Sequence, residues 1–88
     1  MRQNPDYLLR EAADTTVILP VGRAAAAFPG MISVNETGRL LWELLAEEQS
    51  AETLAQALCL RYEAEPDRAR ADVGRFLARL RLAGAILE

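Results

Sequence analysis

Residues 30–45, with the sequence GMISVNETGRLLWELL, decide how this chain folds. Residues 31–34 favour a short strand in which Ile32 and Val34 point to one face, so these two side chains should enter the core. Asn35 can cap the free N–H groups at the start of a helix. The Leu- and Trp-rich run that follows covers a wide arc of this helix, which is expected to end at about Glu47 and to lie at the centre of the core.

Upstream of this stretch, the sequence predicts an antiparallel hairpin. Residues 7–11 and 15–19 are short runs of strand-forming residues with a turn between them, and Pro20 should end the second strand. Residues 22–30 give conflicting signals, because four alanines favour a helical turn while Pro29-Gly30 marks a tight turn. The conformation of this connector is therefore left open.

Downstream, the sequence predicts two further helices. Ser50 should cap a helix from residue 51 to about 64, Pro66 favours the first turn of the next helix, and Gly84 favours its C-terminal cap. The first helix is expected to bury Leu54, Ala57, Leu58 and Tyr62, with Cys59 beside them as a small apolar side chain. The last helix is expected to bury Ala69, Val73, Phe76, Leu77, Leu80 and Ala83. Three short N-terminal antiparallel strands followed by three helices make one α+β domain, residues 1–88, with a winged helix-turn-helix-like layout.

Composition argues against catalysis. The chain has no histidine, one cysteine and five scattered glycines. It therefore lacks the commonest general base and metal ligand, and it cannot form an internal disulfide or a glycine-rich phosphate loop. We expect no enzymatic activity, no catalytic residues and no bound metal or cofactor. No stretch approaches the ~20 apolar residues of a membrane span, and the N-terminus lacks the apolar region of a signal peptide, which predicts a cytoplasmic protein.

Charge is distributed unevenly along the chain. Residues 1–65 carry five arginines and ten acidic residues, a balance of −5, whereas residues 66–88 carry five arginines and three acidic residues, a balance of +2. A basic helix on a protein with a net charge of −3 fits an acidic peptide partner better than DNA. Two other interpretations stay open: a solvated helix face, and a winged-helix DNA-binding regulator that uses the arginine-rich last helix.

The run Gly30-Met31-Ile32-Ser33-Val34-Asn35-Glu36-Thr37-Gly38, followed by the Leu/Trp-rich helix, resembles the PqqD family. Agreement at Leu8-Leu9-Arg10-Glu11, at residues 17–22 and at residues 72–84 extends the resemblance over nearly the whole chain. It implies a RiPP recognition element, which holds the leader segment of a ribosomally made precursor peptide and presents the core segment to a modifying enzyme, often a radical SAM maturase. It does not indicate which precursor or modification is involved, or whether pyrroloquinoline quinone is the product.

The resemblance also implies a leader-binding groove between the third strand and the third helix. The residues expected there are Met31, Ile32, Ser33 and Val34 on one wall and Val73, Arg75, Phe76, Arg79 and Leu80 on the other. An exposed strand edge offers unpaired N–H and C=O groups that an extended peptide can cap, although without the resemblance a merely protected edge is the simpler interpretation. The expected partners are thus the precursor peptide and its modifying enzyme, with no nucleic acid and no membrane, for a monomer or weak homodimer.

Overall fold

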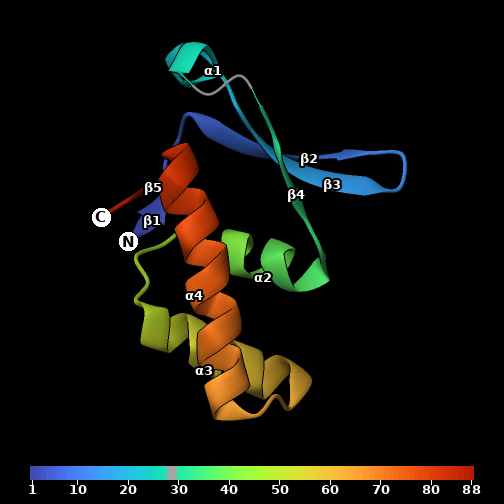
Figure 1. Ribbon diagram of the computed structural model, residues 1–88, viewed down its shortest axis with the longest axis vertical. Helices are drawn as coiled ribbons and strands as arrows, with labels where there is room; N and C mark the ends of the chain where they lie inside the picture. Colours follow the sequence, from blue (N-terminus) through green and yellow to red (C-terminus); the bar gives the residue numbers. More distant parts are fainter. Residues whose placement is uncertain (28–29) are drawn as a thin grey trace.

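A three-stranded antiparallel sheet is built from the N-terminal part of the protein (Figure 1). The computed structural model describes residues 1–27 and 30–88. The strand order is β2-β3-β4, with β2 at Tyr7–Ala12, β3 at Thr15–Pro20 and β4 at Ile32–Val34. Val17 of β3 lies opposite Ser33 of β4. The predicted hairpin and third strand are confirmed, and the strand order leaves β4 at an edge of the sheet.

Three helices follow the sheet, as the sequence predicts. They are α2 at Glu36–Leu44, α3 at Ala51–Tyr62 and α4 at Pro66–Ala83. The Asn35 side chain caps α2 by accepting a hydrogen bond from the Gly38 N–H at 2.9 Å. Ser50 caps α3 in a reciprocal box with Thr53, and Gly84 ends α4 in the left-handed region with φ 78°. The α+β class, with antiparallel strands ahead of helices, is confirmed.

Helix α2 ends at Leu44 rather than at about Glu47, because the chain continues to Glu47 in tighter i→i+3 turns: the Ala46 N–H donates to the Glu43 carbonyl and the Glu47 N–H to the Leu44 carbonyl, both at 3.2 Å. The Gln3 backbone N–H donates to the Leu45 carbonyl at 2.7 Å, and the Gln3 side chain donates to a second carbonyl of the helix at 2.6 Å. The Gln49 side chain donates to the Leu44 carbonyl at 3.0 Å. These bonds tie the end of α2 to the N-terminal residues and to the segment before α3.

Helix α3 is also shorter than expected. It ends at Tyr62 because Glu63 adopts a left-handed φ of 52°, which turns the chain toward α4. The prediction that Tyr62 is buried is wrong: its side chain is 39% exposed and faces a cavity, because it lies in the last turn before the chain turns away. The buried residues of α3 are Leu54, Ala55 and Leu58, and Ala57 and Cys59 are half-buried.

Two parts of the structure go beyond what the sequence pattern predicts. Strand β1, Arg2–Gln3, pairs with strand β5, Ile86–Leu87, so the two ends of the chain lie side by side (Figure 1). Helix α1, Arg23–Ala27, occupies the connector whose conformation the sequence left open. Strands β1 and β5 have two residues each and are too short to display a hydrophobic period, whereas α1 forms at the alanines that favour a helical turn. The sequence also indicates a turn at Pro29-Gly30, and Pro29 lies outside the residues that the structure describes.

The core lies where the sheet meets α2, α3 and α4. Leu41, Trp42 and Leu45 are 1%, 3% and 0% exposed, which confirms that the region of α2 is central and that Trp42 is a core residue. All six residues expected on the inner face of α4 are buried. Within residues 1–27 and 30–88, no helix is long and apolar enough to cross a membrane.

Tyr7 connects the first strand of the sheet to the end of α4. Its hydroxyl donates a hydrogen bond to the Ala83 carbonyl, and its side chain is 4% exposed. Burial, and to a smaller extent the carboxylate of Asp6, raises the pKa of Tyr7 above its ordinary value of 10.0. The phenol is therefore neutral at physiological pH and acts as a structural donor.

We expect Tyr7→Phe to lower the free energy of unfolding by about 0.5–1.5 kcal/mol at neutral pH, because one buried hydrogen bond is lost. Since the pKa is raised in the native state, the stabilisation from the Tyr7 proton is complete below about pH 10 and is lost as the pH rises through the native-state pKa. Urea unfolding at neutral pH and across the alkaline range measures both effects. An alkaline loss as steep in the variant as in the wild type would contradict this role.

Candidate functional site

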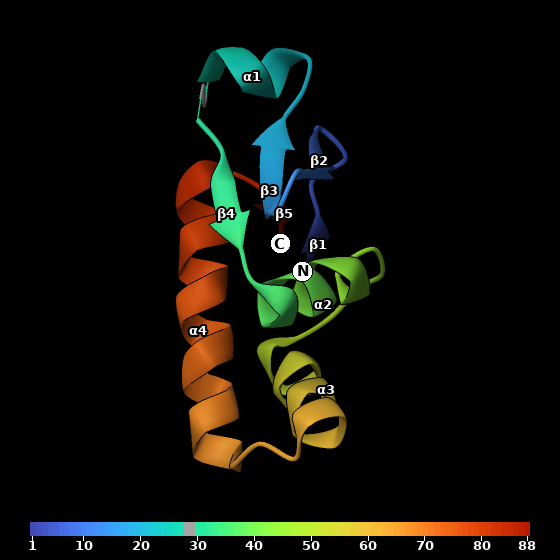
Figure 2. The ribbon, with the colours of Figure 1, turned by 90° about the vertical axis from the view of Figure 1, so that its right-hand side faces the viewer.

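The open edge of β4 faces the long helix α4, and the two elements run side by side (Figure 2). The Arg79 side chain donates from Nη2 to the Ser33 carbonyl at 2.6 Å, which links the edge to the helix. In an antiparallel strand, the N–H and C=O of one residue point to the same side, and this side alternates along the chain. The backbone of Ser33 therefore presents both polar groups to α4 and not to β3.

Two cavities lie beside α4, one just after the end of β4 and one at its start, and together they are called the β4–α4 groove. The first, the polar cavity, has a volume of about 490 Å³. Its lining residues are Asn35, Thr37, Gly38, Leu41, Arg68, Asp72, Arg75, Phe76 and Arg79. Arg75 forms an ion pair with Asp72, and the three arginines against one carboxylate give the cavity a balance of +2. This charge favours anionic groups.

Gly38 allows α2 to approach the floor of the polar cavity. A Cβ atom at this position would lie 3.2 Å from Cε1 of Phe76 and 3.2 Å from Cβ of Val34. Both contacts are tighter than ordinary van der Waals contact. The glycine of the Asn-Glu-Thr-Gly motif therefore serves the close packing of α2 against β4 and α4.

The second cavity of the groove, the apolar cavity, lies at the start of β4 and has a volume of about 230 Å³. It is lined by Met31, Ile32, Arg79, Leu82 and Ala83. The Met31 side chain is 63% exposed and the Leu82 side chain 92% exposed. Two large apolar side chains exposed beside one cavity are suited to contact an apolar partner group.

The structure brings most of the expected site residues to the groove. Met31, Ile32, Arg75, Phe76 and Arg79 line its two cavities, and Ser33 meets it through its carbonyl group. Val73 and Leu80 do not line it: they are 1% and 0% exposed, because the inward face of α4 packs into the core. Val34 is half-buried and lines a different cavity.

The sequence missed several residues of the groove. Arg68 and Asp72 in the polar cavity lie on the same flank of α4 as Arg75, and helical spacing could have added them. Leu82 could have been found as a leucine outside the buried face of α4. Thr37 and Ala83 gave no signal, because their role depends on how α2 and β4 are placed against α4.

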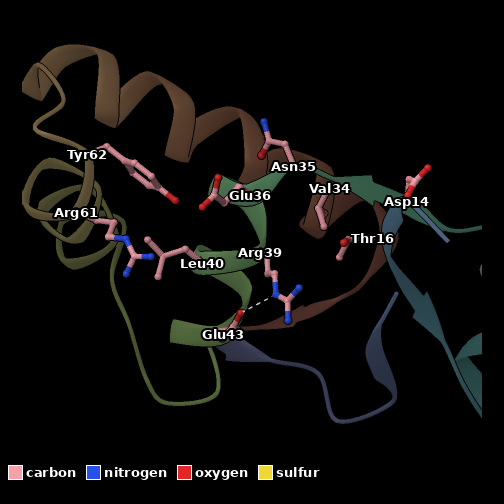
Figure 3. A pocket seen from close by; sticks show the side chains of 10 residues that line it. All are labelled: Asp14, Thr16, Val34, Asn35, Glu36, Arg39, Leu40, Glu43, Arg61 and Tyr62. Atoms are coloured by element: carbon pink, nitrogen blue, oxygen red, sulfur yellow. Dashed lines mark hydrogen bonds and ion pairs between the residues drawn. The ribbon is translucent and has the colours of Figure 1, made fainter. Parts of the chain in front are cut away.

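A third cavity lies on the other side of the first turn of α2 and is called the α2–α3 cavity (Figure 3). Its volume is about 610 Å³, and it is lined by Asp14, Thr16, Val34, Asn35, Glu36, Arg39, Leu40, Glu43, Arg61 and Tyr62. Arg39 is paired with Glu43 at 3.1 Å and also with Glu11, and the Arg61 guanidinium lies 5.9 Å from the centre of the Tyr62 ring. The strand residues that line it, Thr16 and Val34, are paired with each other across β3 and β4, so this cavity offers no free strand edge.

Four of the five arginines of α4 have acceptors within the protein. Arg70 pairs with Glu52 and Asp67, Arg75 with Asp72, and Arg81 with Glu88, while Arg79 donates to the Ser33 carbonyl. Of these contacts, the one from Arg79 reaches β4. The others are exposed ion pairs, which contribute little, so they do not prevent Arg75 from meeting a charged partner. Among the described residues, no group of three or more His, Cys, Asp or Glu side chains could hold a metal ion.

The fold and the groove define a class of protein: a small winged helix-turn-helix domain of mixed α+β type, open between its edge strand and its last helix. Comparison with protein families matches residues 15–86 to the family described as "Coenzyme PQQ synthesis protein D (PqqD)". Because the match covers most of the 88 residues, the chain belongs to the PqqD family. The resemblance noted from the sequence is thereby confirmed.

Two solved structures are similar to this chain over nearly their whole length. One is "TbiB1 in Complex with the TbiA(beta) Leader Peptide", with a TM-score of 0.74 and 20% identity, covering 97% of this chain and 93% of that chain. The other is "Lasso peptide synthetase B1 complexed with the leader peptide", with a TM-score of 0.74 and 25% identity, covering 99% of this chain and 96% of that chain. A comparison with curated proteins gives no match.

Proposed function

We propose that this protein binds the leader segment of a ribosomally synthesised precursor peptide in the β4–α4 groove and presents the peptide to a modifying enzyme. The observation that carries the proposal is the open edge of β4, where the Ser33 carbonyl is bonded to Arg79, a residue that lines both cavities of the groove. Membership of the PqqD family supports it, and so do two similar structures that were solved with leader peptides.

The leader binds as an additional strand along β4. Met31 just precedes β4 and Ser33 lies within it, two residues apart, so their backbone groups turn to the same side of an extended chain. Because the Ser33 carbonyl already accepts a hydrogen bond from Arg79, this edge offers about three free backbone hydrogen bonds worth ~1 kcal/mol each, and a fourth forms where the leader displaces Arg79. Two or three apolar side chains in the groove add about 1.5–3 kcal/mol each. Ordering the leader costs at least ~2–5 kcal/mol, in addition to the loss of translational freedom.

The site residues that we propose for the leader are Met31, Ile32, Ser33, Arg75, Phe76 and Arg79, with Leu82 added by the structure. Val73 and Leu80 act from the core, where they fix the position of α4 against β4. The enzyme that receives the peptide is of the radical SAM class or another class of peptide-modifying enzyme. The protein itself supplies binding and orientation rather than chemistry.

We expect the purified protein to leave the mass of its precursor peptide unchanged, because it has no histidine and no pair of cysteines. Addition of the partner enzyme with its cofactors should produce the modified mass, and Ser33→Pro in place of the wild type should lower the yield. Mass spectrometry of the peptide measures all three reactions. A mass change in the absence of the partner enzyme would refute the binding-only role.

A further inference from the structure

The two cavities of the β4–α4 groove differ in chemistry and lie at opposite ends of the same strand edge. The polar cavity begins at Asn35, just after β4, and has a charge balance of +2. The apolar cavity begins at Met31, just before β4, and its other residues besides Arg79 are apolar. Because Arg79 lines both and bonds to the Ser33 carbonyl, it separates one cavity from the other.

The spacing of the cavities matches a short segment of extended peptide. On α4, Arg75 of the polar cavity and Leu82 of the apolar cavity are seven residues apart, or about 10 Å along the helix axis. An extended peptide rises about 3.3 Å per residue, and every second side chain points to the same face. Side chains two to four residues apart in one bound peptide can therefore reach the two cavities.

The direction of the peptide follows from the sheet. All described pairings of this sheet are antiparallel, and antiparallel pairing is the more stable per residue. Since β4 runs from Ile32 to Val34, a peptide added in the antiparallel sense enters beside Asn35 and leaves beside Met31.

We propose that the groove selects leaders by the order of two side chains: an acidic residue that occupies the polar cavity, followed two to four positions later by an apolar residue in the apolar cavity. This inference rests on the proposed function and specifies the leader that the site accepts. The direction of the bound leader also fixes where the core segment emerges, because the leader lies on the N-terminal side of the core in the precursor. The core leaves past Met31 and Leu82, at the end of the groove where α1 stands (Figure 2), so the modifying enzyme receives it there.

The test begins with random peptides of about twelve residues, long enough to extend beyond both cavities, displayed on phage and selected against the protein. We expect the selected sequences to share an acidic residue two to four positions before an apolar one. A synthetic copy with these two residues exchanged should bind at least about tenfold more weakly. Selection against Met31→Asp/Leu82→Asp should lose the apolar preference, whereas the control Leu60→Asp, at an exposed leucine of α3, should keep it.

Direction is measured with a nitroxide label at either end of a selected peptide bound to the ¹⁵N-labelled protein. A label at the C-terminus should broaden the amide signals of Met31 and Leu82, and a label at the N-terminus those of Thr37 and Arg68. The reverse pattern, or selected peptides without this order of residues, overturns the inference while leaving leader binding in place. Selected peptides that bind Ser33→Pro as well as the wild type overturn the proposed strand addition, and the inference with it.

Discussion

Replacing Ser33 with proline is expected to weaken leader binding at least about thirtyfold, which corresponds to a loss of about 2 kcal/mol or more. Proline has no N–H, and its ring lies where the incoming peptide must approach. The lost donor leaves an unpaired carbonyl on the bound leader, which adds to the loss. Because the Ser33 backbone faces α4 and not β3, the substitution spares the hydrogen bonds that join β4 to the sheet.

Titration calorimetry with the leader of the cognate precursor measures this effect, and circular dichroism checks the fold. Ser33→Ala is the matched control, since it removes the exposed hydroxyl but keeps the backbone N–H, and it should bind like the wild type. Wild-type affinity in a folded Ser33→Pro protein would exclude pairing of the leader with this edge.

The double variant Arg75→Glu/Arg79→Glu should weaken leader binding about ten- to a hundredfold, or by about 1.5–3 kcal/mol. The polar cavity changes from three arginines and one carboxylate to one arginine and three carboxylates, so its balance goes from +2 to −2. Acidic side chains of the leader then meet repulsion instead of attraction. This loss of affinity should shrink as the salt concentration rises, because screening weakens both the attraction in the wild type and the repulsion in the variant.

The matched control is Arg70→Glu/Arg81→Glu, which makes the same change of net charge on the same helix outside the groove. Arg70 and Arg81 are paired with carboxylates elsewhere, so leader binding should change little. A DNA-binding helix predicts instead that both double variants lose duplex binding and that leader binding is unaffected. Equal leader affinity for the wild type and for Arg75→Glu/Arg79→Glu at low salt would show that these arginines form a solvated helix face.

The sequence predicts the main elements of this fold because their signals are local. Asn35 and Ser50 cap helices, Pro66 and Gly84 bound the last helix, and alternation places Ile32 in the core. The short pairing of β1 with β5 could not be predicted, since it joins residues from the two ends of the chain that have no pattern of their own.

Part of the candidate site was also predictable, because its signals are local in the sequence. The family motif locates the edge strand, and helical spacing locates Arg75, Phe76 and Arg79. Spacing does not reveal how far α4 turns toward the core, which is why Val73 and Leu80 belong to the interior and Leu82 to the groove. The bond from Arg79 to the Ser33 carbonyl likewise depends on tertiary placement.

The central claim is that a leader peptide pairs with the open edge of β4, and amide hydrogen exchange at Ser33 tests it most directly. In the free protein the Ser33 N–H faces the groove, so it should exchange rapidly, whereas the N–H groups of Ile32 and Val34 point to β3. Saturation with leader peptide should slow exchange at Ser33 at least about tenfold and change exchange at Ile32 and Val34 less. Unchanged exchange at Ser33, with peptide bound at saturation, would contradict the account.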